Sequence, residues 1–374
     1  PVPALDRFFE ISARGSTVAG EIRGGVVTFI AMAYIVVLNP IILSGAADVT
    51  GHKLGFTQVS AVTALAAGVM TILFGVVARL PFAFAAGLGI NSFLASSVVG
   101  SVSWPEAMGL VVIDGLIIVA LAVSGLRRLI FDAVPMPLKL AITAGIGLFI
   151  LFIGLVDAGF VGSTGLPSPP LGLGAKGAGS ITTVPTLIFV FTLLVTGILV
   201  ARKVRGGILI GLISGTVVAV VVEAVWHLGS AADKAGGWGL SVPTLTGSPF
   251  ALPDLSLVGD VSLASFGRIG ILAGIMLVFT LVFTNFFDAM GTFTGLSRQA
   301  GLADEHGNFP RLQSALVVEG AGAVVGGAVS ASSNTVFIES GTGIGEGART
   351  GLASLVTGGL FLAAPGQHAA EHHF

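Results

Sequence analysis

The sequence predicts an all-α integral membrane protein, and three observations carry that prediction. Hydrophobic residues make up 54% of the 374 positions, charged residues only 10%, and the mean hydropathy is +1.00. A soluble globular protein carries about 25% charged residues. Stretches of about 20 apolar residues, the length that crosses a bilayer as a helix, recur along the chain. Glycine occurs 55 times, which suits closely packed or interrupted membrane helices.

The apolar windows predict about eleven membrane spans. Two longer polar connections, 157–183 and 229–267, are rich in Gly, Pro and Ser. Connections of this length are uncommon inside compact soluble domains but ordinary outside a membrane. The predicted spans are 24–44, 56–78, 81–100, 105–124, 135–156, 184–201, 206–228, 269–296, 312–330, 333–347 and 349–364.

The distribution of lysine and arginine predicts the orientation. With a cytoplasmic N-terminus, 13 of the 17 basic residues fall on the cytoplasmic side, and only Lys53, Lys176, Lys234 and Arg268 fall on the other. Such a bias follows the positive-inside rule. We therefore expect a multi-pass protein of the cell inner membrane with both long connections outside the cytoplasm. No basic residue falls in the middle of a predicted span, which disfavours an anion as substrate.

The third and tenth predicted spans are poor helices. The third opens with Pro81 and carries Gly87 and Gly89, and the tenth, 330–346, alternates small, β-branched and glycine residues. Glycine and β-branched residues weaken helices and favour extended backbone. Interrupted spans at corresponding places in two halves point to a midplane binding site in transporters built from inverted repeats. Spans three and ten are seven apart, so a seven-plus-seven inverted repeat would pair them, with short extended segments in both.

Two carboxylates lie at membrane depth, Asp288 in the eighth span and Glu339 in the tenth. An ionisable group there is costly, and it usually faces a cavity and marks a substrate or proton path. The sequence therefore predicts a transporter.

Four segments resemble one transporter family. The segments 28–40, 87–91, 285–292 and 338–351 are similar to those of the AzgA-type adenine/guanine/hypoxanthine permeases, which belong to the nucleobase:cation symporter-2 (xanthine/uracil permease) group. The resemblance implies two inverted repeats of seven spans. Spans one to four and eight to eleven would form a core domain, and five to seven with twelve to fourteen a gate domain. It also implies proton-coupled uptake of purine nucleobases by movement of the core against the gate, with a homodimer as one expected assembly.

These expectations divide the chain into six parts. They are a cytoplasmic N-terminal segment 1–23, core spans one to four in 24–124, gate spans five to seven in 135–228, an extracytoplasmic loop 229–267, core spans eight to eleven in 268–364, and a polar tail 365–374. Eleven spans are fewer than fourteen. We therefore expect the C-terminal spans to be missing, and this chain alone to transport little.

The resemblance places the family's substrate site on Asn91, on the segment from Asn285 to Asp288, and on Glu339. We expect Phe93 to stack on the base. A carboxylate can accept paired hydrogen bonds from a guanine-type edge, and Asp288 and Glu339 are also expected to carry the coupled proton. The family usually has Asp where this chain has Asn285, and an amide can hydrogen-bond a base but cannot titrate.

Each of these residues also has a structural alternative. Glu339 could accept hydrogen bonds from backbone amides of the broken tenth span. Asp288 could cap a helix break or hold the neighbouring span, and Asn91 could satisfy backbone groups freed by the glycines before it. Asp114 and Glu319 lie at membrane depth too, where helix–helix hydrogen bonding explains them as well as a proton relay does.

Other functions stay open beside purine transport. One is a related permease for uracil or xanthine, and another is a transport-dead membrane protein, supported by Asn285 and the number of spans. A membrane enzyme is least favoured, because the spans hold no paired catalytic constellation or metal-ligand spacing. The chain has no cysteine, so thiolate metal sites are excluded. We expect no cofactor and no nucleic-acid partner.

Overall fold

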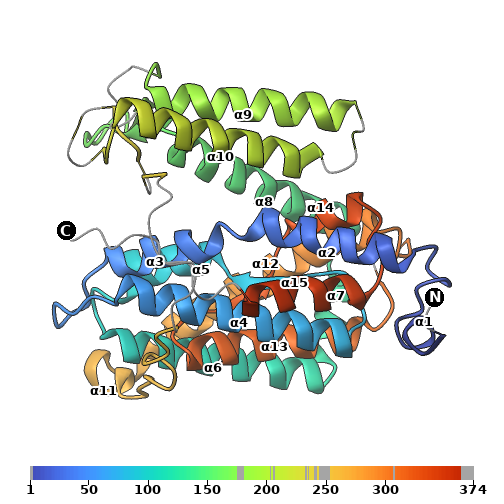
Figure 1. Cartoon of the computed structure of the whole chain (residues 1–374). Coiled ribbons are helices and arrows are strands. Elements are labelled where there is room, and N and C mark those ends of the chain that lie inside the picture. Colours follow the sequence, from blue (N-terminus) through green and yellow to red (C-terminus); the bar gives the residue numbers. More distant parts are fainter. Residues whose placement is uncertain are drawn as a thin grey trace. The chain divides into compact units, whose positions relative to one another are not determined.

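The computed structural model describes residues 3–174, 181–202, 204, 207–231, 234, 236–239, 242–243, 253–305 and 308–363. Helices dominate this part of the chain (Figure 1). The chain folds into two compact units, one drawn from Pro1–Thr143 and Ser248–His368 and the other from Ala144–Gly247. The predicted polar tail 365–374 and parts of the predicted loop 229–267 lie outside the described residues.

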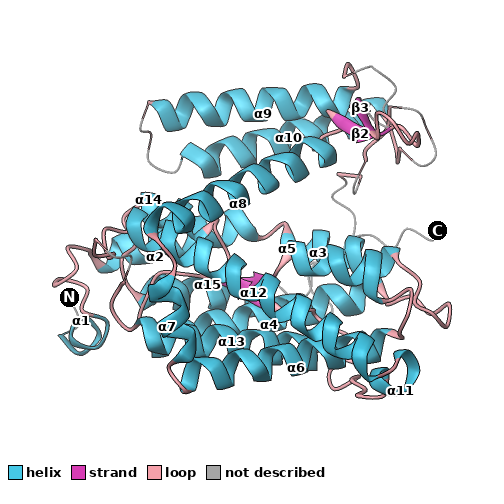
Figure 2. Cartoon of the chain, turned by 180° about the vertical axis from the view of Figure 1, so that it is seen from behind, coloured by secondary structure: helices cyan, strands magenta, loops and turns pink. Residues whose placement is uncertain are grey.

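The first unit is a helical assembly around one pair of short strands, drawn in magenta in Figure 2. β1 (Phe84–Ala86) and β4 (Asn334–Val336) run antiparallel, with Ala85 opposite Thr335. Its longer helices are α2 (Val18–Met32), α3 (Ile35–Gly45), α4 (Phe56–Val77), α6 (Trp104–Val123), α12 (Ile271–Gln299), α13 (Leu312–Ala328) and α15 (Gly351–Ala363). Its short helices are α1 (Pro3–Phe9), α5 (Leu88–Phe93), the π-helix η1 (Leu94–Val98), α7 (Leu126–Ala133), α11 (Ser265–Ile269) and α14 (Ser340–Gly345).

The second unit contains α9 (Val184–Ala201), α10 (Gly207–Trp226) and the greater part of α8 (Met136–Asp157), which begins in the first unit. A small hairpin of β2 (Val161–Ser163) and β3 (Leu171–Leu173) follows α8. α9 and α10 pack closely, because a Cβ at Gly211 would lie 2.0 Å from the hydroxyl oxygen of Thr196. The chain after α10 is held by Glu223, whose carboxylate accepts hydrogen bonds from the backbone of Leu228 and from the indole N–H of Trp238.

The predicted spans correspond closely to the observed elements. Eight of them coincide with one helix each, and the first is divided between α2 and α3 at Ala33–Tyr34. Spans three and ten contain a strand followed by a short helix, so the extended segments predicted there are present. Five stretches of the described chain are long and apolar enough to cross a membrane on their own: Val18–Gly45, Phe56–Val77, Trp104–Val123, Val184–Ala201 and Ile271–Gln299. The number of crossings therefore stays a prediction.

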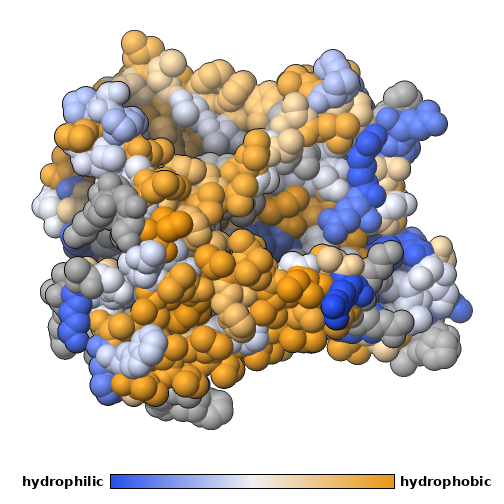
Figure 3. Space-filling view, turned by 90° about the horizontal axis from the view of Figure 1, so that it is seen from above, coloured by the Kyte–Doolittle hydropathy of each residue, from blue (hydrophilic) through white to orange (hydrophobic). Residues whose placement is uncertain are grey.

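Large apolar side chains lie on the outside of the molecule. Leu272 is 77% exposed, and Leu148 and Val225 are each 66% exposed. On the face shown in Figure 3, hydrophobic residues cover much of the middle and hydrophilic residues gather toward the sides. Exposed apolar surface on this scale marks a surface that faces lipid or another apolar partner. Together with the five stretches long enough to cross a membrane, it agrees with a multi-pass membrane protein.

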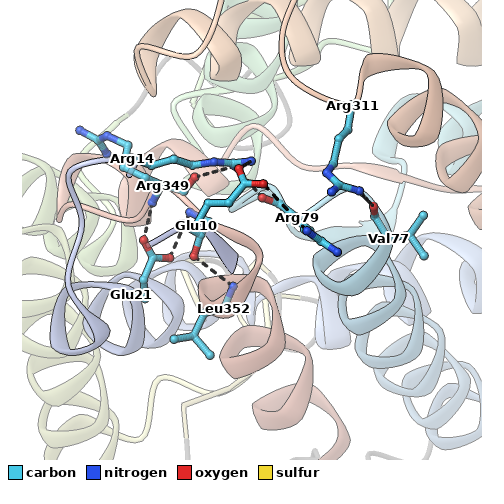
Figure 4. Close-up of polar contacts among 9 residues, drawn as sticks. Glu10, Arg14, Glu21, Val77, Arg79, Arg311, Arg349 and Leu352 are labelled. Atoms are coloured by element: carbon cyan, nitrogen blue, oxygen red, sulfur yellow. Dashed lines mark hydrogen bonds and ion pairs between the residues drawn. The ribbon is translucent and has the colours of Figure 1, made fainter. Parts of the chain in front are cut away.

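A polar cluster ties the N-terminal segment to the ends of α4 and α15 (Figure 4). Glu21 of α2 is fully buried and accepts hydrogen bonds from the backbone N–H groups of Arg349 and Thr350, at 2.8 and 3.2 Å, just before α15 begins. Arg14 donates to the carbonyl oxygen of Arg79 at 2.7 Å and pairs with Glu10 at 3.0 Å. Glu21 therefore satisfies buried backbone amides in the chain that leads into α15.

Glycine lets α4 and α15 pack backbone to backbone. A Cβ on Gly351 would lie 1.9 Å from the carbonyl oxygen of Gly75, and one on Gly75 would lie 2.6 Å from the carbonyl oxygen of Gly351. Small residues at a helix contact allow this close approach within membranes.

Gly351→Ala is expected to lower the free energy of unfolding by about 1–3 kcal/mol, because the added methyl group must push the two helices apart. The matched control is Gly359→Ala, two turns further along α15, where a Cβ meets nothing within 4 Å. Equilibrium unfolding in mixed detergent and SDS micelles compares both variants with the wild type. Equal stability of the two variants would show that the α4–α15 contact tolerates the added methyl group.

Asp48 organises the loop between α3 and α4. Burial by itself would raise the pKa of this carboxyl group, but hydrogen bonds from the Thr50 hydroxyl and from the backbone N–H groups of Trp104, Thr50 and His52 outweigh it, so the pKa is lowered. A lowered folded pKa contributes stability above the unfolded value, about 3.9 for Asp. That contribution is lost as the pH falls through the folded value.

Asp48→Asn is therefore expected to destabilise the protein at pH 7, by about 1–3 kcal/mol, because it weakens charge-assisted hydrogen bonds to partly buried donors. The difference from the wild type should shrink below about pH 4. The measurement is unfolding stability as a function of pH, with Asp132→Asn, an exposed carboxylate on α7, as control. A difference that stays constant from pH 7 to below pH 4 would contradict this account.

Candidate functional site

The candidate site is built where the two interrupted spans meet. β1 leads into α5 and β4 is followed by α14, so both segments change from extended to helical within the first unit. The pairing of the strands satisfies backbone groups that a broken helix would leave exposed at membrane depth. Further bonds join the segments: the N–H of Gly87 donates to the carbonyl oxygen of Ser333, and that of Phe337 to the carbonyl oxygen of Ala83, both at 2.9 Å.

Glu339 is the half-buried carboxylate at the start of α14. Its Oε1 accepts a hydrogen bond from the hydroxyl group of Tyr34 at 2.5 Å. Tyr34 lies at the break between α2 and α3 and is 37% exposed. The contact joins the broken first span to the broken tenth. Tyr34 was not among the predicted site residues. It is the one tyrosine of the chain, and that was a signal that could have pointed to it.

Asp288 lies on α12 and is half-buried. It lies within electrostatic range of Glu319 and Glu339. Among the described residues its carboxylate has no hydrogen-bond or ion-pair partner. The alternative in which Asp288 caps a helix break therefore has no support, because α12 runs without interruption from Ile271 to Gln299. A half-buried carboxylate without a partner among the described residues, within electrostatic range of Glu339, is a candidate ligand-binding group.

Asn91 is fully buried on α5 and is held by another asparagine. Its Nδ2 donates to Oδ1 of Asn39 at 2.6 Å, and Asn39 donates in turn to the Thr63 hydroxyl at 2.8 Å and to the carbonyl oxygen of Ala331 at 3.1 Å. The Oδ1 atom of Asn91 is buried with no hydrogen-bond partner in the described structure. Asn91 thus ties α5 to α3 in this conformation, and one acceptor stays free.

Phe93 and Asn285 complete the predicted set. Phe93 is half-buried and packs against a hydrophobic cluster that includes Leu94, so its stacking on a base stays a prediction. Asn285 is fully buried, one turn before Asp288. Its Nδ2 donates to a carboxylate oxygen of Asp114, and its Oδ1 accepts from the Ser333 hydroxyl at 3.1 Å.

A buried ion pair lies beside this set. Arg127 on α7 and Glu319 on α13 are 1% and 0% exposed in their side chains, and the guanidinium pairs with the carboxylate. Arg127 also donates to the carbonyl oxygen of Leu316 at 2.8 Å, and the Thr335 hydroxyl of β4 donates to Glu319 at 3.4 Å. The sequence placed Arg127 on the cytoplasmic side, outside any span. The long arginine side chain carries its charge away from the backbone position, and the guanidinium is buried among the helices.

The five predicted residues therefore fall into two groups. Asp288, Glu339 and Phe93 are partly accessible, and Asn91 and Asn285 are buried in hydrogen-bonded pairs. Across the described ranges no three acidic, histidine or cysteine side chains converge as metal ligands.

Comparison with known proteins assigns the chain to a family. The profile of the permease family matches residues 19–365. The guanine/hypoxanthine permease PbuG of Bacillus subtilis is 36% identical over 369 residues, which cover 96% of this chain and 77% of that protein. The adenine permease AdeP of Escherichia coli is 33% identical over 361 residues, covering 96% and 74%.

A solved structure shares the fold. The transmembrane domain of a cyanobacterium bicarbonate transporter, BicA, superposes with a TM-score of 0.60 at 18% identity, over 92% of this chain and 81% of that one. At this identity the similarity concerns the fold alone. The chain therefore belongs to the xanthine/uracil permease family, in the group of the AzgA-type adenine/guanine/hypoxanthine permeases, and is a membrane transporter rather than an enzyme.

Proposed function

We propose that this permease carries purine nucleobases (adenine, guanine or hypoxanthine) across the cell inner membrane together with protons. The substrate class is supported by relatives named as guanine/hypoxanthine and adenine permeases at 31–36% identity. The observation that carries the proposal is the pair of partly accessible carboxylates, Asp288 and Glu339, beside the paired strands of the two interrupted spans. A purine edge with adjacent N–H donors matches such acceptors.

In this proposal Glu339 binds the base through its carboxylate, and Tyr34 orients that carboxylate. Asp288 lies close enough for its charge to act on Glu339, so a proton on either group relieves the repulsion between them. Asp288 and Glu339 are the proposed proton-coupling pair. Asn91 and Phe93 are proposed to reach the base once α5 moves, because one acceptor of Asn91 is free and Phe93 is partly exposed.

The packing of the first unit supports two inverted repeats. If spans one to four and eight to eleven are repeats, exchanging each span with the one seven places away is expected to reproduce the most extensive helix–helix interfaces. The α6–α13 pair, spans four and nine, exchanges into α15–α4, and these are the two most extensive helix–helix interfaces of the described chain. The α12–α6 interface exchanges into α2–α15, and the β1–β4 pair exchanges into itself.

We further propose that the first unit is the core and the second unit part of the gate, with transport by movement of one against the other. Support comes from the division of the chain into two units, which groups spans one to four with eight to eleven and leaves α9 and α10 apart. The cytoplasmic N-terminus rests on the bias in basic residues. The homodimer stays a prediction from the sequence.

The test is uptake of radiolabelled hypoxanthine, guanine and adenine by bacterial cells that lack their own purine permeases. We expect uptake that a proton uncoupler abolishes. Excess uracil or xanthine is expected not to compete with it. If uracil or xanthine competed and adenine, guanine and hypoxanthine did not, the proposed substrates would change to uracil or xanthine. Weak uptake by this chain alone agrees with the eleven predicted spans. No uptake of any base, either by this chain or by a version that carries three further C-terminal spans, would refute the proposed function.

A further inference from the structure

A chain of three buried side chains links α6 to the strand pair: Asp114, Asn285 and Ser333. Asp114 lies in the middle of α6 and is fully buried. One of its carboxylate oxygens accepts from the Asn285 amide, and the other is buried with no hydrogen-bond partner in the described structure. Asn285 in turn accepts from Ser333, directly before β4.

The charges around Asp114 do not balance. The charged groups that act on it are Glu319 of α13 and Arg127 of α7, while α12 faces it with the neutral Asn285. The guanidinium of Arg127 is already paired with Glu319. Two carboxylates and one guanidinium leave this buried group one positive charge short of neutrality. An uncompensated buried charge is costly, and one proton on Asp114 supplies the missing charge.

The amide of Asn285 can follow that proton. With Asp114 ionised, the Asn285 amide donates to it and Ser333 donates to Asn285, as observed. With Asp114 protonated, its O–H can donate to Oδ1 of Asn285, and the turned amide then donates to Ser333. A serine hydroxyl serves as donor or acceptor, so both arrangements keep two hydrogen bonds, with their directions reversed.

We propose that Asp114 binds a proton during the transport cycle and that Asn285 passes its charge state to Ser333, at the start of the β4 segment, by reversing two hydrogen bonds. The proton enters from water and forms one O–H bond with a carboxylate oxygen, so the buried group gains one positive charge and no other covalent bond changes. Ser333 lies next to β4, whose chain continues to Glu339. The proposal rests on the proposed proton symport, and it makes Asp114 a positioning residue that acts through Asn285.

The first test needs no substrate. Infrared difference spectra of the full chain in liposomes, taken between acidic and neutral pH, report protonated carboxyl groups through their C=O stretch. A band that Asp114→Asn removes and Asp132→Asn retains is expected; Asp132 is exposed and pairs with Arg128. A spectrum unchanged by Asp114→Asn would overturn the proposal.

The second test measures hypoxanthine accumulation driven by an imposed pH gradient. Asp114→Asn is expected to exchange hypoxanthine without accumulating it. The exchanged pair Asp114→Asn/Asn285→Asp is expected to regain accumulation, because an acid again faces an amide. That exchange is also informative if the single variant misfolds. Accumulation by Asp114→Asn equal to the wild type would overturn the proposal. If the wild-type chain moves no purine, either alone or with three further C-terminal spans, the proposed function is refuted instead, and the infrared result on Asp114 stands by itself.

Discussion

Glu339→Gln is expected to weaken uptake of the purine base about tenfold to a hundredfold. A carboxylate offers two acceptors to a pair of N–H donors, whereas the glutamine amide offers one acceptor and one donor. One N–H of the base then faces another N–H, and an unsatisfied polar group in a buried site costs about 1–3 kcal/mol. Since 1.4 kcal/mol is about a factor of ten in affinity, a rise in KM of this size should follow.

Tyr34→Phe gives a graded companion to this substitution. It keeps both acceptors of Glu339 and removes the hydroxyl that orients them. Loss of one hydrogen bond is worth about 0.5–1.5 kcal/mol, so we expect a KM increase of roughly two- to tenfold. Initial rates of hypoxanthine uptake over a range of concentrations measure KM and maximal rate separately, with membrane levels determined by immunoblot.

Glu305→Gln is the matched control, because Glu305 is exposed in the connection between α12 and α13. It should leave KM unchanged. If Glu339→Gln behaved like Glu305→Gln, Glu339 would be a structural acid, and Asp288 would be left as the accessible carboxylate of the site. If Tyr34→Phe had the larger effect of the two, the hydroxyl rather than the carboxylate would be the group that contacts the base.

The fold was predictable from the sequence wherever composition and local backbone preference decide it. Apolar windows located the helices, and the glycine and β-branched residues of the third and tenth spans located β1 and β4. The break between α2 and α3 was not foreseen, because Met32 to Tyr34 carry neither glycine nor proline. At this break Tyr34 makes a long-range hydrogen bond to Glu339, and no local pattern in the sequence predicts such a contact.

The assignment of the site residues stays a prediction, and the pairings between them could not be predicted from the sequence. Asn285 and Asp114 lie 171 positions apart, and no local pattern in a single sequence reports a contact over that distance. The burial of Arg127 was missed for a related reason. Its backbone lies beyond the end of α6, in short α7, and only the packing of α7 against α13 brings the guanidinium to Glu319.

Arg127→Met is expected to lower the free energy of unfolding by about 3–5 kcal/mol, because it leaves the Glu319 carboxylate buried without its cation. Loss of the bond to the carbonyl oxygen of Leu316 adds to the cost. Arg128→Met is the neighbouring control: this arginine is exposed, and its 3.7 Å pair with Asp132 is of a kind worth about 0–1 kcal/mol. The measurement is equilibrium unfolding in mixed detergent and SDS micelles, followed by tryptophan fluorescence.

The double variant Arg127→Met/Glu319→Gln separates the value of the ion pair from the cost of breaking it. Replacing both partners of a buried pair by neutral residues is often close to neutral in stability, so most of the loss in Arg127→Met should be recovered. Recovery would mean that the pair is not required for folding, and uptake by the stable double variant would then measure its role in transport directly. If the double variant were as unstable as Arg127→Met, the lost stability would come from the contacts of Arg127 with Leu316 and the Phe286 ring. If Arg127→Met were as stable as Arg128→Met, that result would contradict the buried ion pair itself.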